Sequence, residues 1–269
     1  MNNFLTLSSV FLLVFVFQTA VYTGDSAVHM AGDHVEPAVS IVNFGSSNSR
    51  NSPENVALNA LSCIGNRVTV VSGDAKGIEG TVIGKHGGIE NVMVEFPDEA
   101  FDKLVIGDEM QVRAFGMGME VINANDIFVK NLGPQLLDAL NENGMGVSED
   151  GRLHVPVTHR IPAKIMGSGL GQRHAYTGDS DIQMFDGDVV ERYGLDTLRF
   201  GDIVAIVDAD HRFGRIYRGG AVTIGVVVHS ISIIAGHGPG VVTLITSPGG
   251  NIETVIDPGA NLAPLLNLR

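Results

Sequence analysis

Apolar and polar positions alternate along much of the first half of the chain, and this pattern predicts short β-strands. It is clearest at Arg67–Val71, and similar runs follow at 80–84, 91–96 and 109–113. A period of two places successive side chains on opposite faces of a sheet. Glycine, serine and aspartate separate the runs, and these are typical turn residues. The first half is therefore predicted to consist of strands joined by tight turns.

The second half contains strands of a more continuously apolar kind. Residues 200–208 and 221–234 are rich in β-branched side chains, which is typical of strands that are buried on both faces. A shorter strand at 153–157 follows the Asp150-Gly151 turn. We expect these runs to form the central strands of a second β-rich unit.

Only two convincing helical patterns interrupt the strands. Ser52 and Pro53 suit the N-cap and first position of a helix that we expect to end near 64–65. Leucines on one side of 135–142 predict a second helix, and 189–193 a short helical turn. The fold class is therefore predicted as mainly β, an α+β fold with few short helices. We expect two β-rich, barrel-like domains, residues 1–130 and residues 131–269.

Charge and cysteine content exclude several classes of protein. The net charge of −13 and the pI near 5.0 oppose binding to phosphate backbones, so we expect no nucleic-acid partner. Cys63 is the single cysteine, which excludes an intrachain disulfide and a zinc site built from several thiolates. At the end of a predicted helix, Cys63 is interpreted as a buried apolar residue rather than a nucleophile.

The apolar run within 5–22 leaves two interpretations open. No lysine or arginine precedes it and no clear cleavage site follows, so a buried strand is favoured over a signal peptide. The run is also too short and too weakly flanked to predict a stable membrane span. We therefore expect a cytoplasmic protein, with secretion as the alternative if the run is a signal.

Two resemblances bear on the fold. Residues 66–83 resemble the glycine-punctuated hairpin of KOW-type SH3-like barrels, which binds RNA in ribosome-associated proteins. Acidic residues surround Lys76 and Lys85 here, so the likeness indicates barrel geometry rather than RNA contact. Six further segments together resemble domain-of-unknown-function family 4438, which implies a two-part β-rich fold and supplies no catalytic residues. The segments are GDHVEPAVSI (32–41), SCIGN (62–66), GKHGGI (84–89), HRIPAKIMGSGLG (159–171), LRFGDIVAIVDADHRFGRIYRGGAVTIGVVVHS (198–230) and GHGPG (236–240).

The segment GDHVEP at 32–37 is a candidate metal or acid–base site. If it is extended, His34 and Glu36 lie on one face, where an imidazole and a carboxylate can share one metal ion or one proton. Asp33 lies on the other face and is a candidate catalytic base. The alternative is an ion-paired surface histidine with no catalytic role.

Further candidate ligands come from the second half, because a metal needs three or four ligands. Asp210 and His211 follow a buried strand, where loops are held in place. Glycines leave the imidazole of His237 uncovered, and His159 is a further candidate ligand and catalytic residue. The predicted metal ligands are thus His34, Glu36, His159, Asp210, His211 and His237, and the predicted cofactor is a divalent ion of zinc, manganese or iron.

Two other groups were weighed for binding roles. Lys85-His86-Gly87-Gly88 can hold an anion through its backbone N–H groups and the lysine, although a plain hairpin turn is equally consistent. His229 interrupts a β-branched run and is interpreted as a hydrogen-bonded core residue.

No sequence motif names a reaction. Phosphate-loop and serine-nucleophile signatures are absent from the sequence, which makes a nucleotide-binding or serine-hydrolase function improbable. Nine histidines, several in glycine-rich or acidic segments, favour a metal-assisted hydrolase that acts on a small-molecule substrate. The alternative is a non-catalytic module that binds a small ligand or a protein, and in either case the protein is a possible homo-oligomer.

Overall fold

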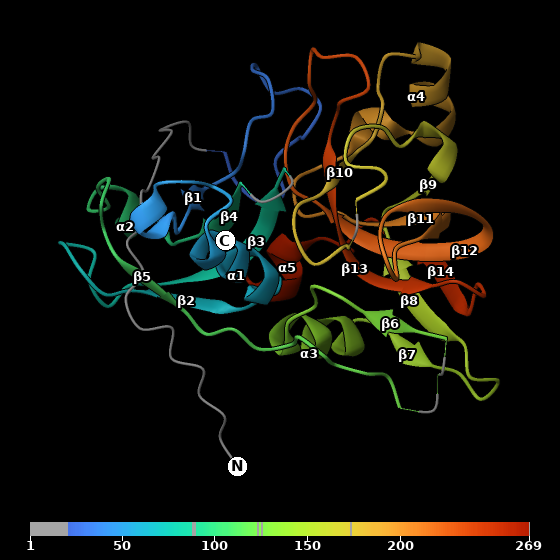
Figure 1. The fold of residues 1–269 in the computed structure, drawn as a ribbon. Helices are drawn as coiled ribbons and strands as arrows, with labels where there is room; N and C mark the ends of the chain where they lie inside the picture. The colour runs from blue at the N-terminus through green and yellow to red at the C-terminus, as the bar shows by residue number, and fades with distance from the viewer. Residues whose placement is uncertain (1–20, 88–89, 123, 125, 173, 269) are drawn as a thin grey trace.

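The structure is a computed structural model that describes residues 21–87, 90–122, 124, 126–172 and 174–268. The question of a buried strand or a signal peptide at 5–22 therefore lies outside the described residues, apart from the last two positions of that run. Among the described residues, no helix combines the length and apolar character needed to cross a bilayer. Figure 1 shows two groups of strands side by side, with helices at their edges.

The first half forms a five-stranded antiparallel sheet in the order β1-β4-β3-β2-β5. The interior strand β4 is buried along its whole length, whereas β2 alternates between exposed and buried residues as its sequence predicts. The hairpin of β2 and β3 pairs Arg67 with Thr81. The strands are β1 (Val39–Ile41), β2 (Arg67–Val70), β3 (Glu79–His86), β4 (Asn91–Glu95) and β5 (Met110–Val112).

The second half contains a larger sheet in the order β10-β13-β12-β11-β9, in which β6 also pairs with β13. The long β12 ends at Val227 and not at 234 as the apolar pattern predicts, because the chain turns away after Val228 to form a loop. The strands are β6 (Phe128–Val129), β9 (His159–Pro162), β10 (Ser180–Asp181), β11 (Ile203–Asp210), β12 (Ile216–Val227) and β13 (Gly240–Ser247). A small third sheet has the order β14-β8-β7, with β7 (Gly146–Val147), β8 (Leu153–Val157) and β14 (Ile252–Ile256).

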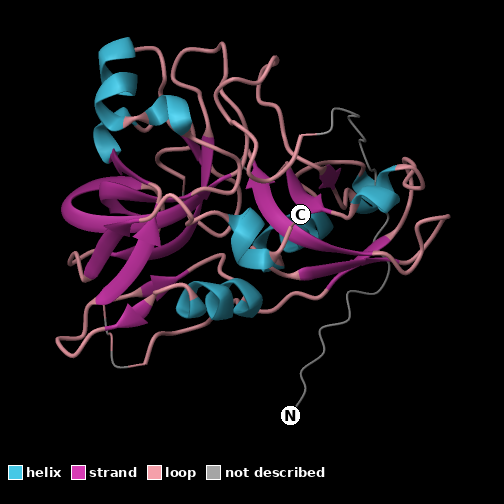
Figure 2. Ribbon diagram, turned by 180° about the vertical axis from the view of Figure 1, so that it is seen from behind, coloured by secondary structure: helices cyan, strands magenta, loops and turns pink. Residues whose placement is uncertain are grey.

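Helices are short, and Figure 2 shows some of them between the two groups of strands and others at the outside of the molecule. The hydroxyl of Ser52 accepts a hydrogen bond from the Asn55 amide and caps the first helix, which ends at Leu61, earlier than expected. The helices are α1 (Pro53–Leu61), α2 (Asp98–Phe101), α3 (Pro134–Glu142), α4 (Gly187–Tyr193) and α5 (Leu262–Leu266), with 3-10 turns η1 (Gly45–Ser47), η2 (Ala163–Ile165) and η3 (Leu195–Thr197). The prediction of a mainly β fold is confirmed.

The two halves share one hydrophobic core. Val94 of the first sheet and Leu244 of the second belong to the same buried cluster, and β6 crosses from the first half of the chain into the second sheet. The division at 130/131 stays a prediction. The shared core fixes the two sheets against each other, and this contact positions the site described next.

Candidate metal centre

Four segments that are distant in sequence meet where the two halves join. They are the loop at 27–36, the end of β3, β10, and the loop at 228–239 that connects β12 to β13. Backbone hydrogen bonds join the first and fourth segments: Ile231 donates to Ala27, His34 to Ile231, and Ser230 to Val35. Figure 1 shows these two loops beside each other above the sheets.

The backbone of the GDHVEP segment differs from the extended strand expected for it. His34 has φ +49° and Ala38 has φ +64°, both in the left-handed region. Such a residue costs about 1–2 kcal/mol relative to ordinary conformations. The argument that placed His34 and Glu36 on one face of a strand is therefore wrong. Both nevertheless contact His86: the Glu36 carboxylate bonds Nδ1 of His86, and the His34 ring stacks on it with centroids 5.6 Å apart.

Two glycines permit the close approach of these segments. An added Cβ on Gly84, in β3, would lie 2.8 Å from the Cε of Met93 and 3.0 Å from Val228. Only glycine lets β3 pass so near the end of β12, and this brings His86 beside His229, with ring centroids 4.5 Å apart. A Cβ on Gly240 would lie less than 3.0 Å from both His229 and Asp179.

The result is a cluster of four imidazoles and two carboxylates, which we call the His/Asp cluster. Three overlapping sets of its residues each place three potential ligand atoms within 4.8 Å of one another. The first set is His34, His86 and His229; the second is His34, Asp181 and His237; the third is Asp179, Asp181 and His229. Among the described residues these are the groups close enough to hold a metal ion.

On one side of the cluster, Asp181 faces two histidines. Its Oδ2 lies 3.1 Å from Nδ1 of His237 and 3.8 Å from Nε2 of His34, and the two ring nitrogens are 3.2 Å apart. A point equidistant from the corners of a triangle with these sides lies about 2.0 Å from each, which matches zinc–nitrogen and zinc–oxygen bond lengths of about 2.0–2.2 Å. The three atoms can therefore bind one ion together.

On the other side, His229 faces both aspartates and is almost completely buried. Its Nε2 lies 3.0 Å from Oδ2 of Asp179 and 3.7 Å from Oδ1 of Asp181. Burial alone would lower the pKa of His229, but the two carboxylates outweigh it and raise the pKa to about 10. This position strongly favours a positive charge, which either a proton or a bound cation can supply.

Oδ2 of Asp179 is the clearest sign that the hydrogen bonding in the protein is incomplete. The atom is buried and accepts no hydrogen bond, even though Nε2 of His229 is within ion-pair distance. Proximity alone does not satisfy a directional acceptor. A buried carboxylate oxygen without a donor is costly in an apolar surrounding, and a metal ion at this point would satisfy it.

Outer partners hold the imidazoles in the orientation that metal binding requires. Nδ1 of His34 lies 3.3 Å from Asp33, Nδ1 of His86 bonds Glu36, and Nδ1 of His229 lies 2.9 Å from the carbonyl oxygen of Ser230. With the proton on each Nδ1, each Nε2 can bind a metal, which at His229 displaces the proton that the two aspartates favour. Carboxylates and carbonyls hold metal-binding histidines in this way.

Glu36 is held in turn by a network of its own. Burial raises its pKa, but hydrogen bonds from His86, Ser40 and Asn91 outweigh this effect and lower the pKa below its usual value. For His86, burial lowers the pKa and the bond to Glu36 reverses the shift, so the pKa is raised. The Glu36 carboxylate is therefore ionised and fixes the ring of His86.

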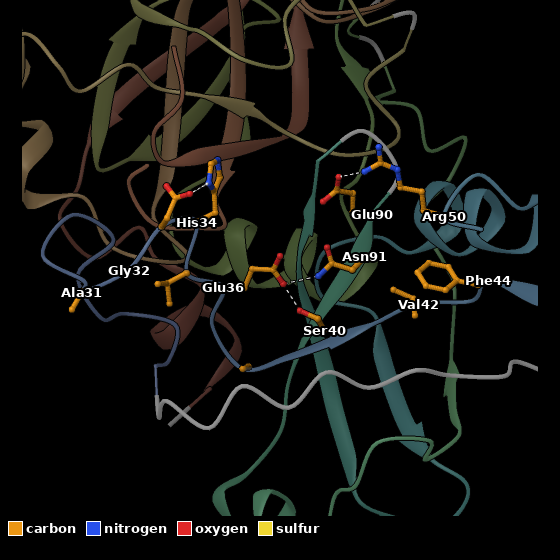
Figure 3. A pocket seen from close by; sticks show the side chains of 13 residues that line it. Ala31, Gly32, His34, Glu36, Ser40, Val42, Phe44, Arg50, Glu90 and Asn91 are labelled. Carbon is orange, nitrogen blue, oxygen red and sulfur yellow. Dashed lines mark hydrogen bonds and ion pairs between the residues drawn. The ribbon is translucent and has the colours of Figure 1, made fainter. Parts of the chain in front are cut away.

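A cavity of about 590 Å³ opens beside the cluster, as Figure 3 shows. His34 and Glu36 lie at one end, and Val42 and Phe44 form part of an apolar wall. An ion pair between Arg50 and Glu90 lies at the opposite side of the view. A small molecule in this cavity would have the imidazole of His34 within reach.

Comparison with known proteins identifies the family of the chain. The model of the domain of unknown function DUF4438, N-terminal, matches residues 14–138, and the model of DUF4438, C-terminal, matches residues 144–266. The chain belongs to the DUF4438 family. A crystal structure of the protein TM1086 is similar, with 44% identity and a TM-score of 0.82, over 91% of this chain and 82% of that chain. No curated protein matches.

The structure of this DUF4438 protein brings together part of the predicted site. His34 and His237 lie in the His/Asp cluster, whereas Glu36 and Asp33 support it from outside. His86, which sequence analysis assigned to an anion loop, is a potential metal ligand. The glycine-flanked imidazole of His237 does face the cluster, at a half-buried position.

His159 lies apart from the cluster. Its Nε2 is 3.1 Å from the carbonyl oxygen of Gly194 and 3.0 Å from the hydroxyl of Thr197, and its Nδ1 is 2.8 Å from Thr158. Burial lowers its pKa. With both nitrogens engaged, His159 ties β9 to the turn that follows α4 and joins no group of potential ligands among the described residues. The structure does not support its predicted role as a ligand or catalytic residue.

Asp210 and His211 also have other partners. Asp210 pairs with Arg212 at 2.8 Å and with Arg218 at 3.7 Å. Nδ1 of His211 lies 2.7 Å from the hydroxyl of Thr243, and burial with the nearby Arg215 lowers the pKa of His211 to about 3. Neither belongs to a group of potential ligands among the described residues.

The predicted anion loop is built differently from the expectation. The amine of Lys85 is buried and donates to Oδ1 of Asn131 at 2.7 Å and to the carbonyl of Tyr176 at 2.8 Å, so it cannot reach an anion at the turn. Burial lowers its pKa to about 7. The carbonyl of Gly87 accepts a hydrogen bond from the amide of Asp179, which ties this turn to the cluster. Gly88 lies outside the described residues.

Sequence reasoning missed three members of the cluster. Asp179 and Asp181 occur in the segment Gly178-Asp179-Ser180-Asp181, where two acids alternate at a short strand, and this spacing was the available signal. His229 was interpreted as a core residue because of its β-branched neighbours. It is buried, but its partners are the two aspartates and not the core.

Proposed function

We propose that this protein is a metal-dependent enzyme, most simply a hydrolase, that acts on a small molecule bound in the cavity beside His34. The observation that carries the proposal is the His/Asp cluster, in which buried carboxylates and buried or half-buried imidazoles face one another around shared points. Such a concentration of titratable groups at the mouth of a cavity is typical of functional sites. If the two buried aspartates had only a structural role, the free energy of desolvating their charges would destabilise the fold.

The ligand types restrict the metal. Imidazole nitrogens and carboxylate oxygens without thiolates suit zinc, manganese or iron. A bound divalent ion would polarise a carbonyl or phosphoryl oxygen and lower the pKa of a bound water toward neutrality. Asp33 lines the cavity, is partly exposed, and belongs to none of the ligand groups. We assign it the role of base that takes a proton from the attacking water.

The cavity indicates the kind of substrate. Its walls carry Val35, Val42 and Phe44, so a substrate with an apolar body fits better than a sugar or a nucleotide. The reacting group would point to His34 and the metal, next to Asp33. The charged pair of Arg50 and Glu90 offers one polar contact at a distance from the reacting end.

Hydrolysis by the metal-loaded protein tests the proposal. We would load untagged protein with zinc, manganese or iron and measure hydrolysis of small esters, lactones, amides and phosphoesters that carry apolar groups. We expect turnover of at least one class, loss of turnover after chelation, and a rate reduced by about 10²–10⁴ in Asp33→Asn when the metal concentration is high enough to keep the variant fully loaded. Asp74→Asn, at an exposed loop position, is the matched control.

A fully loaded protein that hydrolyses none of these classes would contradict the enzyme proposal. In that case, retention of a small apolar ligand in the cavity would favour the non-catalytic binding module. Equal activity of Asp33→Asn and wild type would refute only the role given to Asp33.

A further inference from the structure

The two oxygens of the Asp181 carboxylate face different partners. Oδ2 faces His237 and His34, and it also accepts a hydrogen bond from the amide of Gly238 at 3.3 Å. Oδ1 faces Nε2 of His229 at 3.7 Å. A carboxylate whose oxygens point to two sets of ligands can bridge two ions.

Each side of Asp181 offers at least three donors. The first side has Oδ2 with His34 and His237, in the triangle whose centre lies about one metal–ligand bond length from each atom. The second side has Oδ1 with His229 and Asp179, and these three also form a group within 4.8 Å. Nε2 of His86, which shares a group with His229, is available as a fourth donor there.

The number of donors argues against a single ion. If one ion took all six side chains, it would have no open position for water or substrate, whereas catalytic sites keep one. If one ion took only the first side, Oδ2 of Asp179 would stay buried at ion-pair distance from His229 but without a hydrogen bond. Two ions with three or four protein ligands each satisfy every donor and leave open positions. Ions joined through one carboxylate can lie at the separation of about 3.5–4 Å that two-metal hydrolytic sites show.

We propose that the cluster holds two divalent ions bridged by Asp181. His34 and His237 complete the first position, and Asp179, His229 and His86 complete the second. This inference rests on the proposed function, since both need a metal here, but it adds the number of ions and the division of the ligands. The first position adjoins the cavity through His34 and so is the one nearer the substrate.

Metal stoichiometry tests the inference. Untagged protein is stripped with a chelator, dialysed and titrated with Zn²⁺ and separately with Mn²⁺, and bound metal is measured after gel filtration. We expect two ions per chain in wild type and one in His237→Ala, whose side chain is at the partly exposed edge of the cluster. With Mn²⁺, electron paramagnetic resonance should show a coupled pair in wild type and an isolated ion in His237→Ala.

Further variants separate the two positions. His229→Gln should also fall to one ion, and Asp181→Asn should weaken both ions at least tenfold. His154→Ala, at a half-exposed position near Glu253, is the matched control and should keep two. If His229→Gln fails to fold, as judged by circular dichroism, His237→Ala remains decisive because its side chain is less buried.

The outcomes distinguish the two claims. One ion per chain in folded wild type, or complete loss of metal in His237→Ala, overturns the two-ion inference and leaves the proposed function standing. No bound ion with either metal overturns both. Two ions that show no magnetic coupling with Mn²⁺ would contradict the bridge.

Discussion

Gly240→Ala is expected to damage the metal centre while it leaves the fold in place. Gly240 begins β13, where it pairs with Asp181. Its φ is not in the left-handed region, so the backbone itself accepts alanine. The added Cβ, however, would lie less than 3.0 Å from Nε2 of His229 and from Oδ2 of Asp179, where ordinary contacts begin at 3.4 Å.

The magnitude follows from this overlap. The ring and the carboxylate must move by about 1 Å to restore ordinary contact distances, whereas metal sites tolerate about 0.2 Å in ligand distance. We expect metal affinity to fall at least tenfold, as it does when a residue that orients a metal ligand is mutated. Overpacking of a buried site costs about 1–3 kcal/mol. For a chain of this length that corresponds to a decrease in Tm of roughly 2–6 °C.

The assay combines metal titration with thermal unfolding in excess chelator, so that affinity and intrinsic stability are measured separately. Gly146→Ala is the control, because Gly146 lies in strand β7 and an added Cβ there meets nothing within 4 Å. We expect the control to match wild type in both measurements. If Gly240→Ala binds metal as tightly as wild type, the assignment of His229 and Asp179 as ligands is refuted.

Three further predictions concern ligands, pH and partners. His34→Ala should release metal, and His159→Ala should keep it with a lower Tm; the same metal content in both variants would contradict the separation of these residues. In excess chelator, the contribution of His211 should lower the free energy of unfolding by about 2 kcal/mol between pH 7 and pH 5. The pKa of His211 is about 3 in the folded protein and higher in the unfolded chain, so the unfolded chain binds more protons in this range. His211→Gln should lack this component of the acid destabilisation. Urea unfolding at both pH values measures it, and an equal loss of stability in His211→Gln and wild type would contradict the prediction. The protein should show no measurable affinity for RNA or DNA at physiological salt because of its acidic charge, and salt-sensitive retention of RNA in a filter assay would disprove this.

Local patterns predicted the β-rich fold because its determinants are local. Alternation at 67–71 predicts a half-exposed strand. Ser52-Pro53 predicts the start of a helix, and the cap there is a hydrogen bond between residues close in sequence. The ends were less predictable. The apolar pattern continues to 234, but β12 ends at Val227 because the following residues bond to the loop at 27–35, a contact between distant parts of the chain.

The candidate site depends on such distant contacts. His34 was found through its acidic neighbours, although the local conformation assumed for it was wrong. Asp179 and Asp181 carry no sequence signal of their distance from His229, since pairing of β10 with β13 decides it. His159, Asp210 and His211 have equally suggestive neighbours in sequence, yet their side chains are engaged elsewhere. Residue type and local spacing identify candidates, and only the packing of the two sheets selects among them.

Metal analysis of untagged protein tests the central claim most directly. The protein would be purified without chelator and measured by inductively coupled plasma mass spectrometry, before and after titration with zinc, manganese or iron, with its fold monitored by circular dichroism. The account predicts at least one bound ion per folded chain, retained through gel filtration, and a metal content lower by one ion per chain in His34→Ala. A folded protein that contains no such metal and gains none on titration, or a His34→Ala variant with full metal content, would contradict it.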